Sequence, residues 1–258
     1  MITVLVREVR AELLKVTTTR MVLWLSLALA AYTGLNTAAL IFFSGQQGIP
    51  PLTEPIILRS VFAAAGSASV IVLVLGILGM TTEYRHQTIT ATFLVTPRRG
   101  LVLLGKVKAF AIVGILEGVI AVVVAYGLAL ALLPLKAHAP IQPSTLWEIA
   151  GAVLLAFCVY GIVGVCVGAL IRNQIAAIIA ALVWMILIEP LVVAFLPAVG
   201  KWLPGGAVNA VLGASSFTGG QATGAAYLPA WGGALLLAGY AVVFGVVAAA
   251  TTLRRDIT

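Results

Sequence analysis

Long runs without a charged residue constrain the fold of this chain more than any other feature. No Asp, Glu, Lys or Arg occurs at 21–53, 60–82, 149–171 or 202–253. A run of about 20 apolar residues is long enough for a helix to cross roughly 30 Å of hydrocarbon. Soluble domains are about a quarter charged, whereas 9% of this chain is charged and 62% is hydrophobic. The sequence therefore predicts an integral membrane protein.

Two further apolar segments each contain a single acid, Glu117 and Glu189. Lipid offers the backbone no hydrogen-bonding partner, so every span must be helical. The first span follows a charged segment and precedes five others, so we do not expect a cleavable signal peptide. We predict an all-α membrane fold with six spans at about 21–43, 59–82, 108–133, 148–171, 175–198 and 229–252.

The basic residues predict the orientation of these spans. Membrane proteins keep an excess of Lys and Arg on the cytoplasmic side. With the N-terminus inside, only Arg59, Lys136 and Lys201 fall outside, and the other twelve of the fifteen basic residues fall inside. We therefore expect both termini in the cytoplasm. The net charge of +7 then reflects topology and does not indicate nucleic acid binding.

Residues 1–20 combine charged and aliphatic side chains at helical spacing, with the two kinds on different faces. We predict a helix lying in the cytoplasmic membrane interface, near the lipid headgroups. The alternative is a simple anchor beside the first span. The apolar face holds Ile2, Leu5, Val6, Val9, Leu13 and Val16, and the charged residues are Arg7, Glu8, Arg10, Glu12 and Lys15.

Residues 199–228 contain seven glycines and a single charged residue, Lys201. This segment is too apolar for a well-hydrated loop and too rich in glycine for a stable lipid-facing helix. Irregular backbone at membrane depth is tolerated where protein covers it. We predict a re-entrant or interfacial pair of short helices on the outer side.

Small residues recur at the spacing that lets two membrane helices approach closely. Gly114 and Gly118 form one such pair, and Gly164 and Gly168 form another. We expect them to pack helices within one subunit. A seam between two subunits is the alternative.

Two patterns resemble catalytic or binding sites without the residues that such sites need. The segment 100–106 nearly matches a phosphate-binding loop, but Val107 replaces the hydroxyl that would hold Mg²⁺. His86 and His138 have no ligand cluster or nucleophile at a useful spacing. We therefore predict that this chain is not an enzyme and holds no cofactor or metal.

The segment from Glu83 to Thr88 is a dense polar island between two apolar stretches. Beyond it, Ile89, Phe93 and Leu94 supply an apolar edge, and a Pro-Arg-Arg-Gly sequence ends the helix. We expect residues 83–107 to form a cytoplasmic loop with a short amphipathic helix. A helix held between two spans can dock on a soluble partner and transmit its motion as rigid-body rocking. The alternative is a solvated loop whose charges only fix topology.

These residues also carry a resemblance. Glu83-Tyr84-Arg85-His86-x-Thr88-Ile89, followed by Thr96-Pro97-Arg98-Arg99, resembles the cytoplasmic loop of ABC-2 type permeases. Those proteins are the membrane subunits of bacterial ATP-binding-cassette transporters, mostly exporters. Segments 12–20 and 253–257 are similar to the family's entry into the first span and to its C-terminal ending. Gln87 departs from the glycine expected in many relatives.

The resemblance implies that a separate cytoplasmic ATPase subunit holds ATP and Mg²⁺. Two permease subunits, identical or different, would then form the path in a bacterial plasma membrane. The expected cargo is hydrophobic or amphipathic, such as a drug, an antibiotic or a lipid. The loop would contain a coupling helix that contacts the ATPase through Glu83, Tyr84, Arg85, His86, Gln87, Thr88, Arg98 and Arg99.

The two intramembrane acids support a different reading. Burying a charge in hydrocarbon is costly, so Glu117 and Glu189 should face the bundle interior or a wet cavity. Either could lie on a translocation path for a cation, or could brace neighbouring helices. In the first case the chain could be an ion-coupled carrier, although we find no internal repeat of the kind common in such carriers. A membrane anchor or sensor without transport activity is a further alternative.

Overall fold

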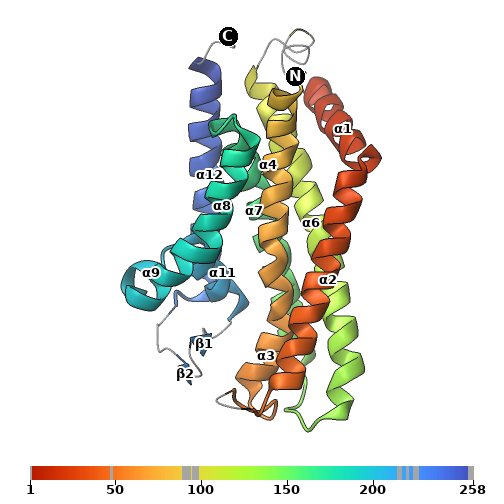
Figure 1. Ribbon diagram of the computed structural model, residues 1–258, viewed down its shortest axis with the longest axis vertical. Coiled ribbons are helices and arrows are strands. Elements are labelled where there is room, and N and C mark those ends of the chain that lie inside the picture. Colours follow the sequence, from red (N-terminus) through yellow and green to blue (C-terminus); the bar gives the residue numbers. More distant parts are fainter. Residues whose placement is uncertain are drawn as a thin grey trace.

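The computed structural model describes residues 2–46, 49–88, 94, 99–213, 217–218, 221–222 and 227–254. Within them the chain forms a bundle of long helices joined by short connections (Figure 1). Six helical segments are long and apolar enough to cross a membrane, as in a multi-pass membrane protein. These spans are Arg20–Phe43, Pro55–Arg85, Gly100–Leu135, Pro143–Leu170, Gln174–Phe195 and Ala230–Thr251.

The helices that build the six spans are α2 (Arg20–Phe43), α3 (Pro55–Ala63), η1 (Ala64–Ala68), α4 (Ser69–Arg85), α6 (Arg99–Leu132), η2 (Leu133–Leu135), α7 (Pro143–Leu170), α8 (Gln174–Val183), η3 (Trp184–Ile188), α9 (Glu189–Phe195) and α12 (Ala230–Arg254). The remaining elements are α1 (Ile2–Thr18), α10 (Pro197–Gly200), α11 (Pro204–Leu212) and the strands β1 (Phe217–Thr218) and β2 (Gln221–Ala222). The first and last described residues lie at the same end of the bundle (Figure 1), which we call the terminal end.

Two helices extend beyond the predicted spans at the terminal end. Helix α4 continues to Arg85, three residues beyond the predicted end of the second span. Helix α6 begins at Arg99, so residues 99–107 are helical and not part of a loop. The prediction treated each charged residue as a sign of water, but Lys106 has charged partners inside the bundle and does not end the helix. The predicted short helix of the loop falls mostly on residues 89–93 and 95–98, outside the described part.

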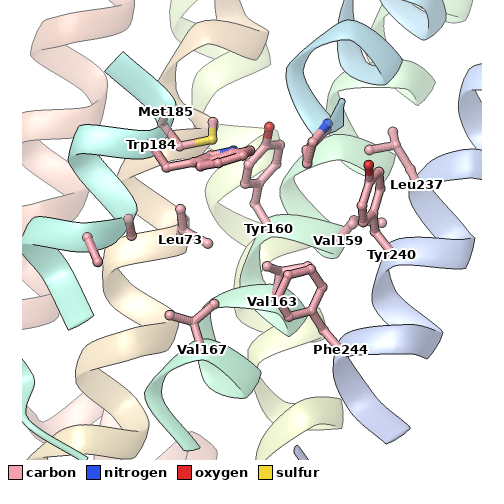
Figure 2. Close-up of a pocket in the computed structure, with 13 residues that line it drawn as sticks. Leu73, Val159, Tyr160, Val163, Val167, Trp184, Met185, Leu237, Tyr240 and Phe244 are labelled. Atoms are coloured by element: carbon pink, nitrogen blue, oxygen red, sulfur yellow. The ribbon is translucent and has the colours of Figure 1, made fainter. Parts of the chain in front are cut away.

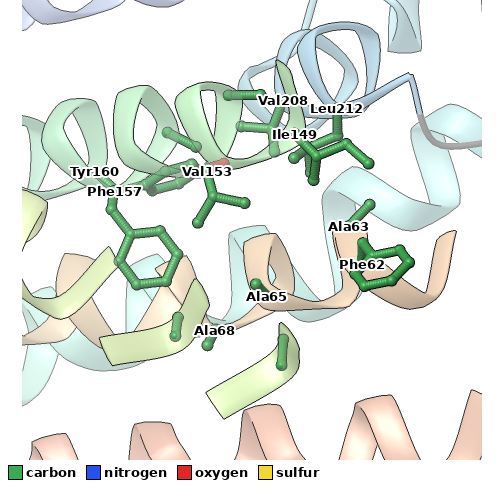
Figure 3. Packing of buried hydrophobic residues seen from close by; sticks show 14 of the residues in the cluster. Phe62, Ala63, Ala65, Ala68, Ile149, Val153, Phe157, Tyr160, Val208 and Leu212 are labelled. Atoms are coloured by element: carbon green, nitrogen blue, oxygen red, sulfur yellow. The ribbon is translucent and has the colours of Figure 1, made fainter. Parts of the chain in front are cut away.

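The second and fourth spans form the centre of the bundle. In the second span 78% of the most apolar window is buried inside the chain, against 11% in the fifth span. The core contains Phe62, Ala65, Val153 and Phe157, with Leu212 of α11 covering one side (Figure 3). The outer spans therefore have large apolar faces that this chain does not cover.

Glycines allow α4 and α7 to pack with their backbones in close contact. A Cβ atom added to Gly76 would lie 2.6 Å from the carbonyl oxygen of Gly161 and 3.0 Å from the Cα of Gly164. A Cβ on Gly168 would lie 2.9 Å from Ile77 O, and Gly114 of α6 meets the backbone of α7. The expectation that both glycine pairs serve packing within the subunit is confirmed.

The fifth span contains a π-helical turn, η3, that ends two residues before Pro190. Proline lacks the N–H that the carbonyl four residues earlier would accept, and its ring clashes with that carbonyl. A π-turn is one way in which a helix absorbs such a defect, and π-turns are frequent at functional sites. Helix α9 does not continue along the axis of α8 (Figure 1).

The sequence predicted a pair of short helices in the segment 199–228, and its described part contains one complete helix, α11. Helix α11 packs on α7 and α12, and its residues from Gly206 to Ala210 are largely buried. The sequence did not predict the two-residue antiparallel pair of β1 and β2. Protein therefore covers α11 on the side that faces the bundle.

Candidate functional site: the terminal end and the intramembrane acids

Four charged side chains form a closed network where α1 crosses α4 and α6. Lys106 Nζ donates to Glu12 Oε2 at 2.8 Å and to Glu83 Oε1 at 2.7 Å. Lys15 Nζ donates to Glu12 Oε1 at 2.6 Å and to the same oxygen of Glu83 at 2.7 Å. We call Glu12, Lys15, Glu83 and Lys106 the ion cluster. Two acids and two lysines make it neutral overall, which makes its burial possible.

Exposure divides the cluster into an inner and an outer part. The side chain of Lys106 is 1% exposed and that of Lys15 is 53% exposed. Lys106 also donates to the carbonyl oxygen of Gly79 at 3.3 Å. Lys106 is therefore the buried centre that holds three helices together, and Lys15 covers the network from outside.

The cluster changes the expected facing of α1. The sequence placed Glu12 on the charged face and Val6 on the apolar face, whereas Glu12 is buried and Val6 is exposed. Leu13 and Val16 do pack on the core, as expected. Helix α1 therefore attaches to the bundle through charge as well as through apolar contacts.

The same network raises the pKa of Lys15, which lies outside the membrane-spanning segments. Burial alone would lower the pKa, because desolvation disfavours the ammonium. The hydrogen bonds and charges of Glu12 and Glu83 outweigh that effect and raise the pKa above the ordinary value of 10.5. Lys15 is therefore charged at neutral pH.

Two of the predicted partner-binding residues have partners within the chain. Glu83 is buried in the ion cluster and does not present its carboxylate at the surface. Tyr84 is partly buried, and the guanidinium of Arg172 lies 5.8 Å from the centre of its ring, a cation–π distance. The sequence-based role of direct partner contact at Glu83 therefore does not fit this geometry, because its charge is already neutralised inside.

Arg85, His86, Gln87 and Thr88 are exposed at the end of α4. The N–H of Thr88 donates to Glu83 O at 3.0 Å and the N–H of Gln87 donates to Tyr84 O at 3.2 Å. These two bonds are the Schellman pattern that closes many helices. Gln87 occupies the left-handed position of that pattern, with a φ of 55°, where glycine is favoured.

The other predicted interface residues lie in or next to the part of the chain that is not described. Arg98 falls outside the described residues. Arg99 is described only as the first residue of α6. The expected grouping of these arginines with the end of α4 stays a prediction.

Glu117 lies near the middle of the third span and faces α2. It is buried, and Ser26 donates a hydrogen bond to its Oε1. Its Oε2 is buried without a hydrogen-bond partner among the described residues. The contact braces α2 against α6.

Glu189 holds the beginning of α11. It is 4% exposed, and the backbone N–H of Gly205 donates to its Oε1. A carboxylate at a helix N-terminus satisfies a free N–H group and interacts favourably with the helix dipole. Glu189 Oε2 has no hydrogen-bond partner within the described part of the chain.

At the opposite end of α11 a cation completes the arrangement. Arg59 Nε donates to the carbonyl oxygen of Leu212 at 2.9 Å, and the positive charge suits a helix C-terminus. Lys136 does the same for α2, because its Nζ donates to Ile41 O and Phe42 O at 2.9 Å each. Two of the three basic residues predicted to lie outside therefore cap helices.

A cavity of about 320 Å³ lies between the fourth, fifth and sixth spans and α4 (Figure 2). Its walls are largely apolar, and the hydroxyl groups of the lining residues Tyr160 and Tyr240 point to the same side in Figure 2. This volume falls within the range of small-molecule sites, about 300–1,000 Å³. Sequence reasoning missed this cavity, because its lining residues are scattered over several helices and give no local pattern.

No group of three or more metal-binding side chains occurs among the residues that the structure describes. A comparison of the chain with models of known protein families and with curated proteins finds no match. The site must therefore be interpreted from its own geometry.

Proposed function

We propose that this chain is the permease subunit of an ABC exporter, driven by a separate cytoplasmic ATPase subunit. The observation that carries the proposal is the continuity between the exposed end of α4 and the ion cluster. Arg85 to Thr88 are exposed, and Glu83, in the preceding turn, is bonded to Lys15 of α1 and Lys106 of α6. A partner that moves this end of α4 therefore moves three helices together.

This geometry suits force transmission, because packed helices with buried polar links move as a body. Glu83 would act as the inner anchor in this scheme, and Arg85 and His86 would contact the ATPase. The coupling helix predicted within residues 83–107 would contact the ATPase. Helix α1, with Val6 and Leu14 exposed, would lie in the membrane interface.

The terminal end would face the cytoplasm of a bacterial cell, in agreement with the basic residues gathered there. Helix α11 would be the re-entrant element on the outer side. The poorly buried fifth and sixth spans would face lipid or a second permease subunit. The cargo would be hydrophobic or amphipathic, and ATP and Mg²⁺ would bind only to the partner.

The test is to purify the tagged chain from its native membrane and to measure the ATPase activity that accompanies it. Arg85→Ala/His86→Ala should lose the ATPase subunit or uncouple its activity without unfolding, because both side chains are exposed. The matched control is Arg10→Ala, which removes an exposed charge from α1 near the same end. It should leave the complex intact.

The two results have different consequences. Loss of ATPase association in the double variant, with normal thermal stability, supports the proposal. The proposal fails if no ATPase accompanies the wild-type chain, or if the double variant and the control behave alike. Glu117 and Glu189 would then be the residues to test for ion coupling.

A further inference from the structure

We propose that the cavity beside η3 binds a hydrophobic cation and that Glu189 serves as its counter-ion. This inference rests on the proposed export function in one respect, because it assigns the class of cargo to a site within the chain. The site itself lies in a single subunit and does not need the ATPase to bind its ligand.

Glu189 does not itself line the cavity, but it lies next to residues that do. Trp184 and Met185 of η3 line the cavity, and the N–H of Glu189 bonds to Trp184 O, one π-turn away. A π-turn closes between residues i and i+5, so Glu189 follows these two lining residues on the same side of the helix. Pro204, which also lines the cavity, immediately precedes the Gly205 that bonds to the carboxylate.

The polar groups of the cavity point to the same conclusion. The lining residues Tyr160 and Tyr240 carry hydroxyl groups that point to the same side of the cavity (Figure 2). The hydroxyl of Tyr240 is occupied, because it donates to Trp202 O at 2.8 Å. The carboxylate is therefore the strongest acceptor near an otherwise apolar space.

The charge of Glu189 is not compensated by any salt bridge within the described structure. Between Lys201 and Arg254 the sequence contains no charged residue at all. A buried carboxylate without a cation is costly, and intramembrane acids usually mark a ligand or ion path. A positively charged ligand would supply the missing partner.

The lining favours a hydrophobic cation over a small inorganic ion. Four aromatic rings contribute to the cavity wall, from Tyr160, Trp184, Tyr240 and Phe244 (Figure 2). Aromatic faces attract cations through their quadrupole and also bury apolar surface. A metal ion would need several oxygen ligands, whereas this wall offers few polar atoms.

The probes for the test are tetraphenylphosphonium, a hydrophobic cation, and tetraphenylborate, an anion of nearly the same shape. Binding of each to the purified full-length chain is measured by equilibrium dialysis in a neutral detergent. The cation should bind at least about tenfold more tightly than the anion, because only the cation pairs with a buried carboxylate. Glu189→Gln, which keeps an acceptor for Gly205, should remove this preference.

Two further variants locate the site. Val163→Phe fills the cavity and should weaken binding of the cation. Glu117→Gln removes the other intramembrane acid, which contacts Ser26 away from the cavity, and should change nothing. Equal binding of the two probes to the wild-type chain would overturn the proposal. So would an unchanged affinity in Val163→Phe, and this result stands even if Glu189→Gln does not fold.

This test and the test of the proposed function are independent. If cation binding is present but no ATPase associates with the chain, the export function fails and the cavity assignment stands. If the ATPase associates but the chain binds the cation no more tightly than the anion, the substrate class is wrong and the export function stands.

Discussion

Lys106 Nζ lies 2.7 Å from Glu83 Oε1, and this contact ties the third span to the last turn of the second. The two residues are separated by 23 positions that include the whole predicted coupling segment. The loop therefore begins and ends on helices that are joined by a buried ion pair. Glu12 extends the join to α1, at 2.8 Å from the same ammonium. The geometry suits a loop that passes on the motion of a partner.

Lys106→Met should strongly destabilise the chain. The substitution leaves Glu12 and Glu83 buried with only the half-exposed Lys15 as a cation. Breaking a buried ion pair from one side costs about 3–5 kcal/mol. The loss should appear as a lower midpoint of thermal unfolding in detergent, with earlier proteolysis at the junction of α1 and α2.

A neutral replacement of the inner network is the control for this prediction. Glu12→Gln/Glu83→Gln/Lys106→Met removes the charges together, and such replacements are often neutral for stability. The triple variant should therefore be more stable than Lys106→Met alone. If it is less stable, the energy of the cluster does not come from compensated charge.

The contribution of Lys15 should be lost at alkaline pH. The acids Glu12 and Glu83 raise its folded-state pKa above the unfolded value of 10.5, against the effect of burial. A raised lysine pKa stabilises the fold fully below the unfolded pKa, and the contribution disappears as pH rises through the folded pKa. From neutral pH upward, the stability difference between the wild type and Lys15→Met should therefore stay constant to about pH 10 and then shrink. A difference that grows above that pH would contradict the assigned contacts.

Gln87→Gly should stabilise the end of α4. Gln87 has a φ of 55°, and a side chain in the left-handed region costs roughly 1 kcal/mol relative to glycine. Part of this gain is lost because glycine is more flexible in the unfolded chain. The midpoint of thermal unfolding should rise slightly. Gln87→Ala is the control, because alanine keeps the unfavourable Cβ and should bring no such gain.

The six spans could be predicted from the sequence because they depend on a local property, the absence of charge over a helical length. The ion cluster could not, because it depends on how three helices cross. Glu83 and Lys106 both looked like residues of a hydrated loop. The sequence did contain one signal. Glu83 lies near the end of the second span and Lys106 near the beginning of the third, where opposite charges on consecutive helices can meet.

The two intramembrane acids show the same limit. A burial cost could be inferred for both from the sequence, together with the need for a partner. The partners themselves, Ser26 for Glu117 and Gly205 for Glu189, follow only from tertiary packing. The left-handed backbone at Gln87 was likewise not inferred, although the expected glycine at this position pointed to it.

Removing Arg59 should loosen α11 without unfolding the spans. Arg59→Met deprives Leu212 O of its donor and removes a cation from a helix C-terminus, an effect of about 0.3–2 kcal/mol. Hydrogen exchange should increase at the end of α11 and remain unchanged in α4 and α7. Lys201→Met is the control, because this lysine lies over the Trp202 ring and does not cap α11. Equal exchange in the two variants would count against the cap.

Gly164→Ala should separate α4 from α7 and destabilise the centre of the bundle. A Cβ at this position would lie 3.0 Å from the Cα of Gly76 and would also meet the carbonyl of Leu73, so backbone must move. Overpacking of this kind costs about 1–3 kcal/mol. Gly151→Ala is the matched control on the same helix, because nothing lies within 4 Å of its added Cβ. The control should be neutral or slightly more stable, since alanine favours a helix over glycine by about 0.5–1 kcal/mol. The test compares the midpoints of thermal unfolding of the two variants in the same detergent. Equal midpoints would mean that the helices do not approach through these glycines.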